Sequence, residues 1–260
     1  LRIVVNNAAA APRARQTTAE GIELQLATNV LAYLQLMRCT RPALATNAPS
    51  RIVNVASELA GGLDVDDLQR EKKEYDGVET YAAAKQADIM LSWEAADRYA
   101  ADRIAVHAAH PGSVPSSRLV REALGDLAAM MGTEVDTPAQ AAATEVLVAT
   151  NPALANVTGR WWVDRRIAEP RPFGAAEPRR QLWQRCVALI DAAANATAAH
   201  DGNATRAVGV GHHRRRRRQQ QQQRLPGRKG RKRRRRKRRR RHALLPDGSV
   251  EIDTISSEDE

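Results

Sequence analysis

The stretch Tyr81-Ala82-Ala83-Ala84-Lys85 decides how this sequence is interpreted. A tyrosine and a lysine four residues apart lie on one face of a helix. A phenol with a pKa of about 10 is a poor acid or base at neutral pH. A neighbouring ammonium stabilises the phenolate and lowers that pKa toward the working range. Because ordinary surface helices also contain such pairs, the surrounding sequence has to decide between the two interpretations.

Outward from this pair, short apolar segments alternate with segments of helical spacing. Strands are predicted at 3–5, 51–55, 104–109 and 161–163, and helices at 21–45, 81–101 and 137–149. Thr80 is expected to cap the second helix, and Thr137-Pro138 to begin the third. The polar segment 61–77 is predicted to be a loop. This alternation is typical of the α/β fold class, in which helices cover both faces of a parallel sheet.

Two further polar residues stand out near these elements. Ser57 follows the predicted strand 51–55, where its hydroxyl is placed to hydrogen-bond a substrate oxygen beside Tyr81. Asn29 lies inside the predicted helix 21–45, although asparagine has a weak helix propensity. Either Asn29 simply faces solvent, or it is a polar anchor that holds a water near Lys85.

Several short motifs follow one another in a fixed order. They are Asn6-Asn7-Ala8-Ala9, Thr28-Asn29-Val30, Val53-Asn54-Val55-Ala56-Ser57, Tyr81 to Lys85, and His110-Pro111-Gly112. In this order they resemble the short-chain dehydrogenase/reductase family, with Ala9 where that family usually has glycine. The resemblance covers about Leu1 to Ile190. It implies a Rossmann-type, doubly wound parallel sheet and an oxidoreductase that moves hydride between NADP (or NAD) and a carbonyl or alcohol.

The resemblance also assigns roles to individual residues. Tyr81 is expected to be the general acid/base, Lys85 to lower its pKa and hold the cofactor ribose, Ser57 to orient the substrate oxygen, and Asn29 to complete a proton relay. The expected cofactor contacts are Asn6, Ala8, Lys85, Pro111, Gly112 and Ser116, the last where the family usually has threonine. No metal ligand is expected.

Two segments point to a subgroup. The stretch between Ser57 and Tyr81 is long for the family, and it is similar to retinol dehydrogenases and WW-domain-containing oxidoreductase relatives. The ending, with Thr158 to Asp164, Glu169-Pro170 and Leu182-Trp183, resembles the same subgroup. The implied substrate is a small hydrophobic carbonyl or alcohol, retinol-like or lipid-like. His110 also fits the subgroup, but no chemistry is expected of it.

One departure from the family affects the expected activity. The sequence contains no Gly-x-Gly-x-x-Gly and no Thr-Gly-x-x-x-Gly-x-Gly, the loop that receives a pyrophosphate at a helix N-terminus. The family's first three strands would precede Leu1. We therefore expect a partial dehydrogenase domain at 1–192, a strand at 3–5 without one of its sheet neighbours, and weak dinucleotide binding by this chain.

Charge divides the sequence into two parts. Up to His200 there are 21 Lys and Arg against 23 Asp and Glu, whereas the remainder has 20 against 7. Residues 193–260 are predicted to be a disordered, Arg/Gln-rich tail. Two interpretations of its basic segment 214–241 stay open. Either it serves nucleic-acid binding or nuclear targeting, in which case the competing function of the chain is a non-enzymatic polyanion- or nucleic-acid-binding protein that acts through the tail, or it is a low-complexity extension that binds polyanions without a purpose. A cytoplasmic location is favoured, with a nuclear one through the tail as the alternative, and no oligomeric state is predicted.

The remaining features of the sequence argue against other classes of protein. Cys39 and Cys186 are far apart and belong to no Cys-x-x-Cys, so they are expected to be buried free thiols rather than part of a disulfide framework or zinc site. No run of about 18 apolar residues occurs, so no membrane-spanning helix is expected. No signal peptide is visible either.

Overall fold

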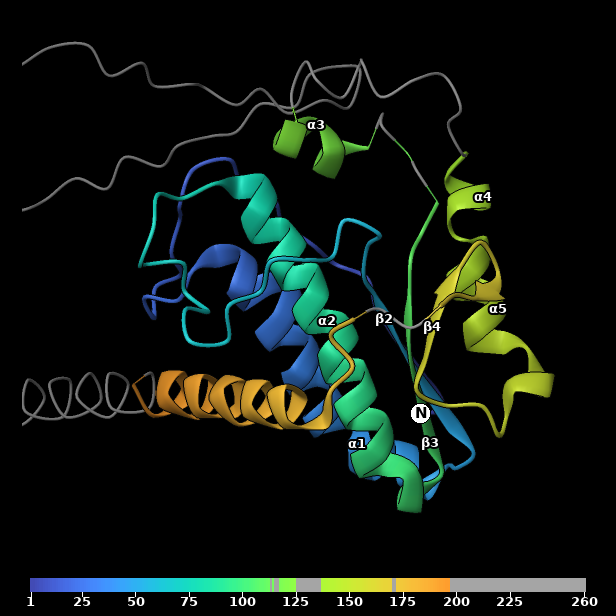
Figure 1. Ribbon diagram of the computed structural model, residues 1–260. Coiled ribbons are helices and arrows are strands. Elements are labelled where there is room, and N and C mark those ends of the chain that lie inside the picture. Colours follow the sequence, from blue (N-terminus) through green and yellow to red (C-terminus); the bar gives the residue numbers. More distant parts are fainter. Residues whose placement is uncertain (113, 115–116, 125–136, 170–171, 197–260) are drawn as a thin grey trace, which may run out of the picture. The chain divides into compact units, whose positions relative to one another are not determined.

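A parallel sheet with helices on both faces forms the centre of the molecule (Figure 1). The computed structural model describes residues 1–112, 114, 117–124, 137–169 and 172–196. The strand order is β1-β2-β3-β4-β5, where the first four strands run parallel and the fifth is antiparallel. The strands are β1 Ile3–Asn6, β2 Ser50–Val55, β3 Ile104–Ala109, β4 Arg160–Val163 and β5 Arg166–Ile167. The predicted α/β class and its four strands are confirmed, and β5 is an addition to them.

The strands differ in burial according to their place in the sheet. Every residue of β2 and β3 is buried, as expected for parallel strands covered on both faces. The outermost strand, β1, pairs with β2 alone among the described residues, and its Ile3 and Val5 are 41% and 44% exposed. β1 is therefore an edge strand with apolar side chains facing outward.

The register brings the ends of the strands together. Asn6 lies opposite Asn54, and Val55 lies opposite Ala109. Since β1, β2 and β3 are parallel, their carboxyl ends share one edge of the sheet. The segments that follow them, which begin at Asn7, Ala56 and His110, therefore start side by side. This edge is where open α/β sheets usually bind ligands.

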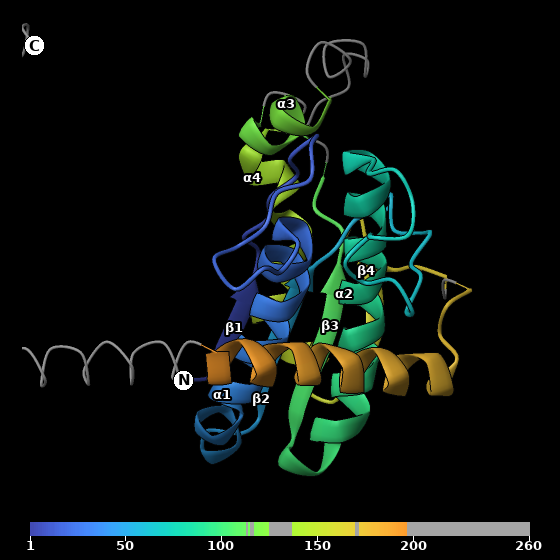
Figure 2. The same cartoon turned by 90° about the vertical axis from the view of Figure 1, so that its left-hand side faces the viewer.

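The two faces of the sheet carry different helices (Figures 1 and 2). One face packs against α1, Ala32–Thr46, and α2, Gly77–Tyr99, through a large apolar cluster. The other face packs against α5, Ala143–Thr150, through a smaller cluster that includes Val53 and Trp162. The shorter helical segments are η2 Ala100–Asp102, α3 Arg118–Leu124, α4 Pro138–Ala141 and η4 Pro152–Leu154.

The first turn of α2 differs from the sequence-based expectation. The helix begins at Gly77, and its N-cap is Asp76, whose side chain accepts a hydrogen bond from the Glu79 N–H at 2.8 Å. The predicted cap at Thr80 is wrong, because Thr80 lies inside the helix and donates its hydroxyl hydrogen to the Asp76 carbonyl at 2.6 Å. An aspartate is a stronger cap than threonine, so the helix starts one turn earlier.

The predicted helices 21–45 and 137–149 are each divided in the structure. The first contains a π-helical turn, η1 Leu26–Leu31, before α1 begins. The second consists of α4 and α5, which meet at Ala142. Its predicted start is confirmed, since Thr137 caps α4 in a capping box with Gln140.

A further helix at 176–196 packs across α1 and α2, and its Leu182, Trp183 and Cys186 belong to the same apolar cluster. It passes the predicted domain end at residue 192. The basic segment 214–241 lies outside the described residues. Cys186 is buried as expected, whereas Cys39 is exposed on α1, so that half of the thiol prediction is wrong. None of the described helices has the length and apolar content needed to cross a membrane.

Candidate active site

Tyr81 and Lys85 lie on the N-terminal half of α2, beside the carboxyl ends of β1 to β3. Lys85 has only 1% of its surface exposed, whereas Tyr81 is partly exposed. The Lys85 Nζ lies 5.7 Å from the centre of the Tyr81 ring. The helical spacing therefore places the two side chains together, as the sequence predicts.

The Lys85 ammonium is held by two acceptors. Its Nζ donates to the Val55 carbonyl at the end of β2 at 2.8 Å, and to Asp88 Oδ2 at 2.9 Å. Burial lowers the pKa of Lys85, but Asp88 together with Tyr33 and Tyr81 more than offsets this effect, so the pKa lies above its ordinary value. Lys85 is therefore a cation at neutral pH, with one N–H bond not used by either acceptor.

Tyr81 is less acidic than the sequence analysis suggests. Burial raises its pKa above the ordinary value, Lys85 lowers it, Asp88 raises it, and a side-chain hydrogen bond with Ser57 lowers it. The expected pull of Lys85 is present, but burial and Asp88 outweigh it. In this structure Tyr81 is thus a protonated phenol at neutral pH, placed next to a cation.

Ser57 lies just past β2 with 7% of its surface exposed. Its Oγ accepts a hydrogen bond from the Leu59 N–H at 3.2 Å, and the Ser57 side chain lowers the pKa of Tyr81. The adjacent Glu58 contacts His110 at the end of β3, where the Glu58 N–H donates to His110 Nδ1 at 3.4 Å. The structure therefore gives His110 a place in the link between the ends of β2 and β3.

Asn29 lies in the π-helical turn η1 with no exposed surface. Its Oδ1 accepts from the Ala10 N–H at 2.8 Å, and its Nδ2 donates to the Ala10 carbonyl at 2.9 Å. The alternative that Asn29 faces solvent is wrong. The side-chain amide anchors the loop after β1, and π-helical turns of this kind occur often at functional sites.

A buried polar chain joins β1 to α2. Asn6 Nδ2 donates to Asn54 Oδ1 at 2.7 Å, Asn54 Nδ2 donates to Ser92 Oγ at 2.8 Å, and the Ser92 hydroxyl donates to the Asp88 carbonyl at 2.6 Å. Asn6 Oδ1 is buried without a hydrogen-bond partner among the described residues. Ala8, two residues further along the chain, is exposed.

The segment after β3 supplies the last predicted contacts. Pro111 and Gly112 are partly exposed, and the Gly112 N–H donates to the Ala141 carbonyl of α4 at 3.0 Å. Ser116 lies outside the described residues, so the structure does not place it. The described site therefore brings together Ser57, Tyr81 and Lys85, with Asn6, Asn29, Ala8, Pro111 and Gly112 on the surrounding segments.

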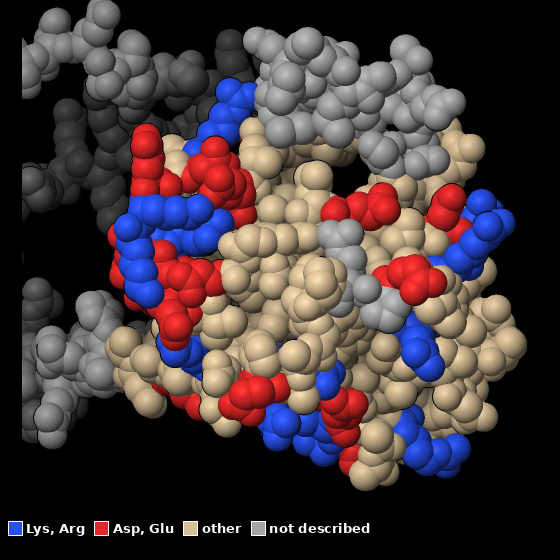
Figure 3. All heavy atoms as spheres, in the orientation of Figure 1, with Lys and Arg blue, Asp and Glu red and all other residues tan. Residues whose placement is uncertain are grey.

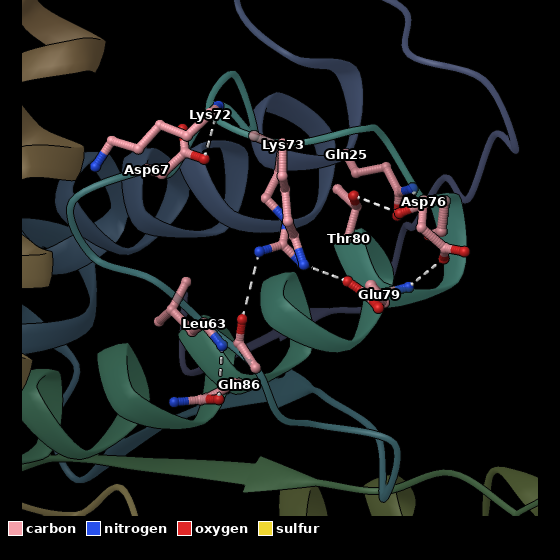
Figure 4. A network of polar contacts seen from close by, with 12 residues as sticks. Gln25, Leu63, Asp67, Lys72, Lys73, Asp76, Glu79, Thr80 and Gln86 are labelled. Atoms are coloured by element: carbon pink, nitrogen blue, oxygen red, sulfur yellow. Dashed lines mark hydrogen bonds and ion pairs between the residues drawn. The ribbon is translucent and has the colours of Figure 1, made fainter.

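The segment between Ser57 and α2 is fixed by polar contacts (Figure 4). Leu63 N–H donates to Gln86 Oε1 at 3.1 Å, Asp67 Oδ2 accepts from the Lys72 N–H at 3.1 Å, and Lys73 forms an ion pair with Glu79. The segment carries both acidic and basic side chains, and Figure 3 shows the two kinds side by side there. The loop is thus tied to the helix that carries Tyr81.

The loop after β1 meets the same region. Gln25 Nε2 donates to the Gly77 carbonyl at 2.9 Å and to Tyr75 Oη at 3.1 Å. A Cβ at Gly77 would lie only 2.5 Å from the Pro12 carbonyl oxygen, so this close approach requires glycine. The start of α2 is therefore packed directly against the loop that Asn29 anchors.

Sequence reasoning missed two members of the site. Asp88 pairs with Lys85, and the Lys85 Nζ lies 5.2 Å from the centre of the buried Tyr33 ring. Helical spacing could have found both, because Asp88 follows Lys85 by three residues and Tyr33 follows Asn29 by four.

Comparisons with known proteins agree with this arrangement. The sequence profile described as short chain dehydrogenase matches residues 1–125. Mouse retinol dehydrogenase 13 is 31% identical over 199 residues, which cover 72% of this chain and 59% of that protein. A Streptomyces antibioticus protein named "Probable oxidoreductase" is 34% identical over 210 residues, covering 71% of this chain and 70% of that protein.

Among solved structures, one described as a short chain dehydrogenase/reductase family protein has 24% identity and a TM-score of 0.47, covering 63% of this chain and 64% of that one. This chain spans about three fifths of the length of mouse retinol dehydrogenase 13. The identity to relatives along most of the described chain, on a parallel sheet that places Tyr81 and Lys85 beside Ser57, shows that it belongs to the short-chain dehydrogenase/reductase family, in the retinol dehydrogenase-like subgroup.

Proposed function

We propose that this chain carries the catalytic half of an oxidoreductase that transfers hydride between NADP or NAD and a carbonyl/alcohol pair. One observation carries the proposal, namely the grouping of a phenol, a buried cation and a hydroxyl at the carboxyl edge of a parallel sheet. The Ser57 side chain lowers the pKa of Tyr81, and the Lys85 ammonium lies 5.7 Å from the centre of the Tyr81 ring. A substrate oxygen seated against Tyr81 and Ser57 meets one group that exchanges a proton and one that orients it.

Each residue has a separate task in this proposal. When a carbonyl is reduced, the protonated Tyr81 Oη donates its proton to the carbonyl oxygen. When an alcohol is oxidised, the phenolate form of Tyr81 takes the hydroxyl proton. Lys85 stabilises the phenolate that proton donation leaves behind. Ser57 fixes the substrate oxygen. Asn29 keeps the loop after β1 in place through Ala10.

The described residues fit the nicotinamide end of a dinucleotide. Lys85 has one N–H bond that neither Val55 nor Asp88 uses, which suits a ribose hydroxyl. Asn6 Oδ1 is a buried acceptor without a described partner. Ala8, Pro111 and Gly112 add partly open loop surface at the same sheet edge. Bound there, the nicotinamide supplies or accepts the hydride.

The choice of substrate rests on the subgroup. The relatives named retinol dehydrogenase 13 suggest a small hydrophobic alcohol or carbonyl, retinol-like or lipid-like. NADP is proposed ahead of NAD on the same resemblance. Neither choice follows from the geometry of Tyr81, Ser57 and Lys85, which any carbonyl/alcohol pair could use.

The test is a chimaera in which the glycine-rich strands of a relative precede this chain. With NADPH and a hydrophobic aldehyde, we expect reduction that Tyr81→Phe lowers by about 100-fold or more in kcat, because general acid catalysis contributes about that factor. Absorbance of NADPH during turnover measures it.

A matched control for this experiment is Tyr99→Phe. Tyr99 is also a buried tyrosine of α2, but it lies against Arg41 at the other end of the helix. Its loss should leave turnover nearly unchanged. Equal activity of the Tyr81→Phe chimaera and its parent would refute the assignment of Tyr81.

A further inference from the structure

The Lys85–Asp88 pair is enclosed more completely than a surface ion pair. The side chains of Lys85 and Asp88 are 1% and 0% exposed, and both lie on α2 within one helical turn. Asp88 uses only Oδ2 in the pair, while its Oδ1 has no hydrogen-bond partner among the described residues. A buried carboxylate with one unpaired oxygen is costly to maintain.

Stability gives a weak reason for such a pair. Buried ion pairs can often be replaced by apolar side chains without loss of stability, because desolvation cancels most of the attraction. Cys186, a buried member of the apolar core cluster, lies close enough to feel the Asp88 charge, so an apolar side chain at position 88 would have apolar surroundings on that side. A purpose connected with Lys85 is therefore the better explanation.

The geometry of the ammonium shows what Asp88 does. An ammonium has three N–H bonds that rotate together. Val55 and Asp88 take two of them, at 2.8 and 2.9 Å, and this fixes the direction of the third. With Val55 alone, the other two N–H bonds could rotate about a single contact.

We infer that Asp88 is a positioning residue, whose carboxylate fixes the direction of the remaining N–H of the Lys85 ammonium and offsets part of the Lys85 charge that acts on Tyr81. The role that this inference gives to Lys85 rests on the proposed function. The contact between Asp88 and Lys85 is independent of the proposed function.

The charged and titratable groups around Asp88 predict how the loss of its charge changes the pKa of Tyr81. It interacts with Lys85 and Tyr81 on α2, with Tyr33 on α1, and with Cys186 on the helix 176–196. Burial raises the pKa of Asp88 itself above its usual range, against the pull of Lys85. The Asp88 charge raises the pKa of Tyr81, whereas Lys85 lowers it. An uncharged residue at 88 should therefore make Tyr81 more acidic.

The experiment titrates the tyrosinates of the purified full chain by ultraviolet absorbance. The chain has four tyrosines, so the Tyr81 signal is taken as the difference from a Tyr81→Phe background. We expect Asp88→Asn to lower the apparent pKa of Tyr81 by about one unit. The control is Asp97→Asn, which removes an exposed aspartate of the same helix, paired with Arg179, and should leave Tyr81 unchanged.

A second measurement covers the case in which Asp88→Asn does not fold. In the unmodified chain, carboxyl carbon-13 spectra should show one aspartate that titrates above the usual range, and the Tyr81 ring signals should shift with the same midpoint. A Tyr81 signal that ignores this titration, or that is unchanged in folded Asp88→Asn, overturns the inference. Neither measurement uses cofactor or substrate, so failure of the chimaera to turn over would count against the proposed function alone.

Discussion

At the residue scale, His107 shows how burial in the core changes the pKa of a titratable side chain. It lies in β3 with no exposed surface, and its Nδ1 accepts a hydrogen bond from Trp162 Nε1 at 3.2 Å. Burial, with a smaller contribution from the nearby Arg51, lowers the pKa of His107 to about 4. The imidazole is therefore neutral at pH 7, and protonating it favours unfolding.

This pKa predicts a loss of stability in mild acid. The pKa of the folded state is depressed below that of the unfolded chain, about 6.5, so the stabilisation is complete above about pH 6.5 and is lost as the pH falls toward 4. Between about pH 7 and about pH 5 we expect this single group to account for about 2 kcal/mol of the free energy of unfolding. Urea unfolding at both values measures it.

The comparison for this prediction is His107→Gln, whose amide can still accept from Trp162 but does not titrate in this range. Between the two pH values, the free energy of unfolding of this variant should fall by about 2 kcal/mol less than that of the unmodified chain. An identical pH dependence in both proteins would contradict the neutral, buried His107.

Single residues also show what sequence reasoning can reach. The spacing of Tyr81 and Lys85 was sufficient to place them together, because a helix fixes neighbours four residues apart. The net acidity of Tyr81 could not be predicted, because it depends on burial and on Asp88. Local spacing predicts which side chains meet, whereas the sheet and the neighbouring helices decide how strongly their charges are felt.

At the element scale, the helix 176–196 is the most consequential addition to the predicted strand–helix units. It covers the outer side of α1 and α2, where Leu182 and Cys186 have no exposed surface. The edges of the Tyr99 and Trp183 rings meet at 86° with centres 6.3 Å apart. The helix thus buries apolar surface of α1, which directly follows the turn that contains Asn29, and of α2, which carries Tyr81.

Truncation of one side chain tests this packing. Leu182→Ala removes a fully buried side chain, and we expect it to lower the free energy of unfolding by about 2–5 kcal/mol. Gln184→Ala, on the exposed side of the same helix, should change it by less than about 0.5 kcal/mol. Denaturant unfolding compares the two. Equal effects would show that the helix does not pack on α1 and α2 in solution.

The helices also show which structural features the sequence pattern could not predict. Apolar spacing predicted a helix at 21–45, but not the π-helical turn η1 that places Asn29 against Ala10. That turn depends on a contact with the loop after β1, which lies 19 residues earlier in the chain. The capping box at Thr137, by contrast, is formed within four residues and was predictable.

At the scale of the whole molecule, β1 is the outermost strand of the sheet that the described residues form, and it pairs there with β2. The four parallel strands were predicted from short apolar runs that alternate with helical segments, and the family resemblance implied a doubly wound sheet, but neither gave the pairing of the strands. Ile3 and Val5 are exposed on β1, and no glycine-rich phosphate loop occurs in the sequence. The described residues offer contacts for a ribose and a nicotinamide, but the sequence lacks the usual donors for a pyrophosphate.

This arrangement predicts weak cofactor binding by the chain alone. Binding must first offset the lost rigid-body freedom of the dinucleotide, and few contacts remain to do so. We expect a Kd for NADPH and NADH weaker than about 1 mM, which corresponds to less than about 4 kcal/mol of binding free energy. Calorimetric titration of the purified chain measures both. Micromolar binding would show that another segment supplies the phosphate site.

The strand order β1-β2-β3-β4-β5 also has a consequence for synthesis on the ribosome. Each strand pairs with the one made just before it, so no strand has to be inserted between two that have already paired. As these strands emerge from the ribosome, each can add to the side of the sheet that the strand before it has just formed. Among the described strands, β5 therefore completes the sheet and arrives at a surface that β1 to β4 have already built.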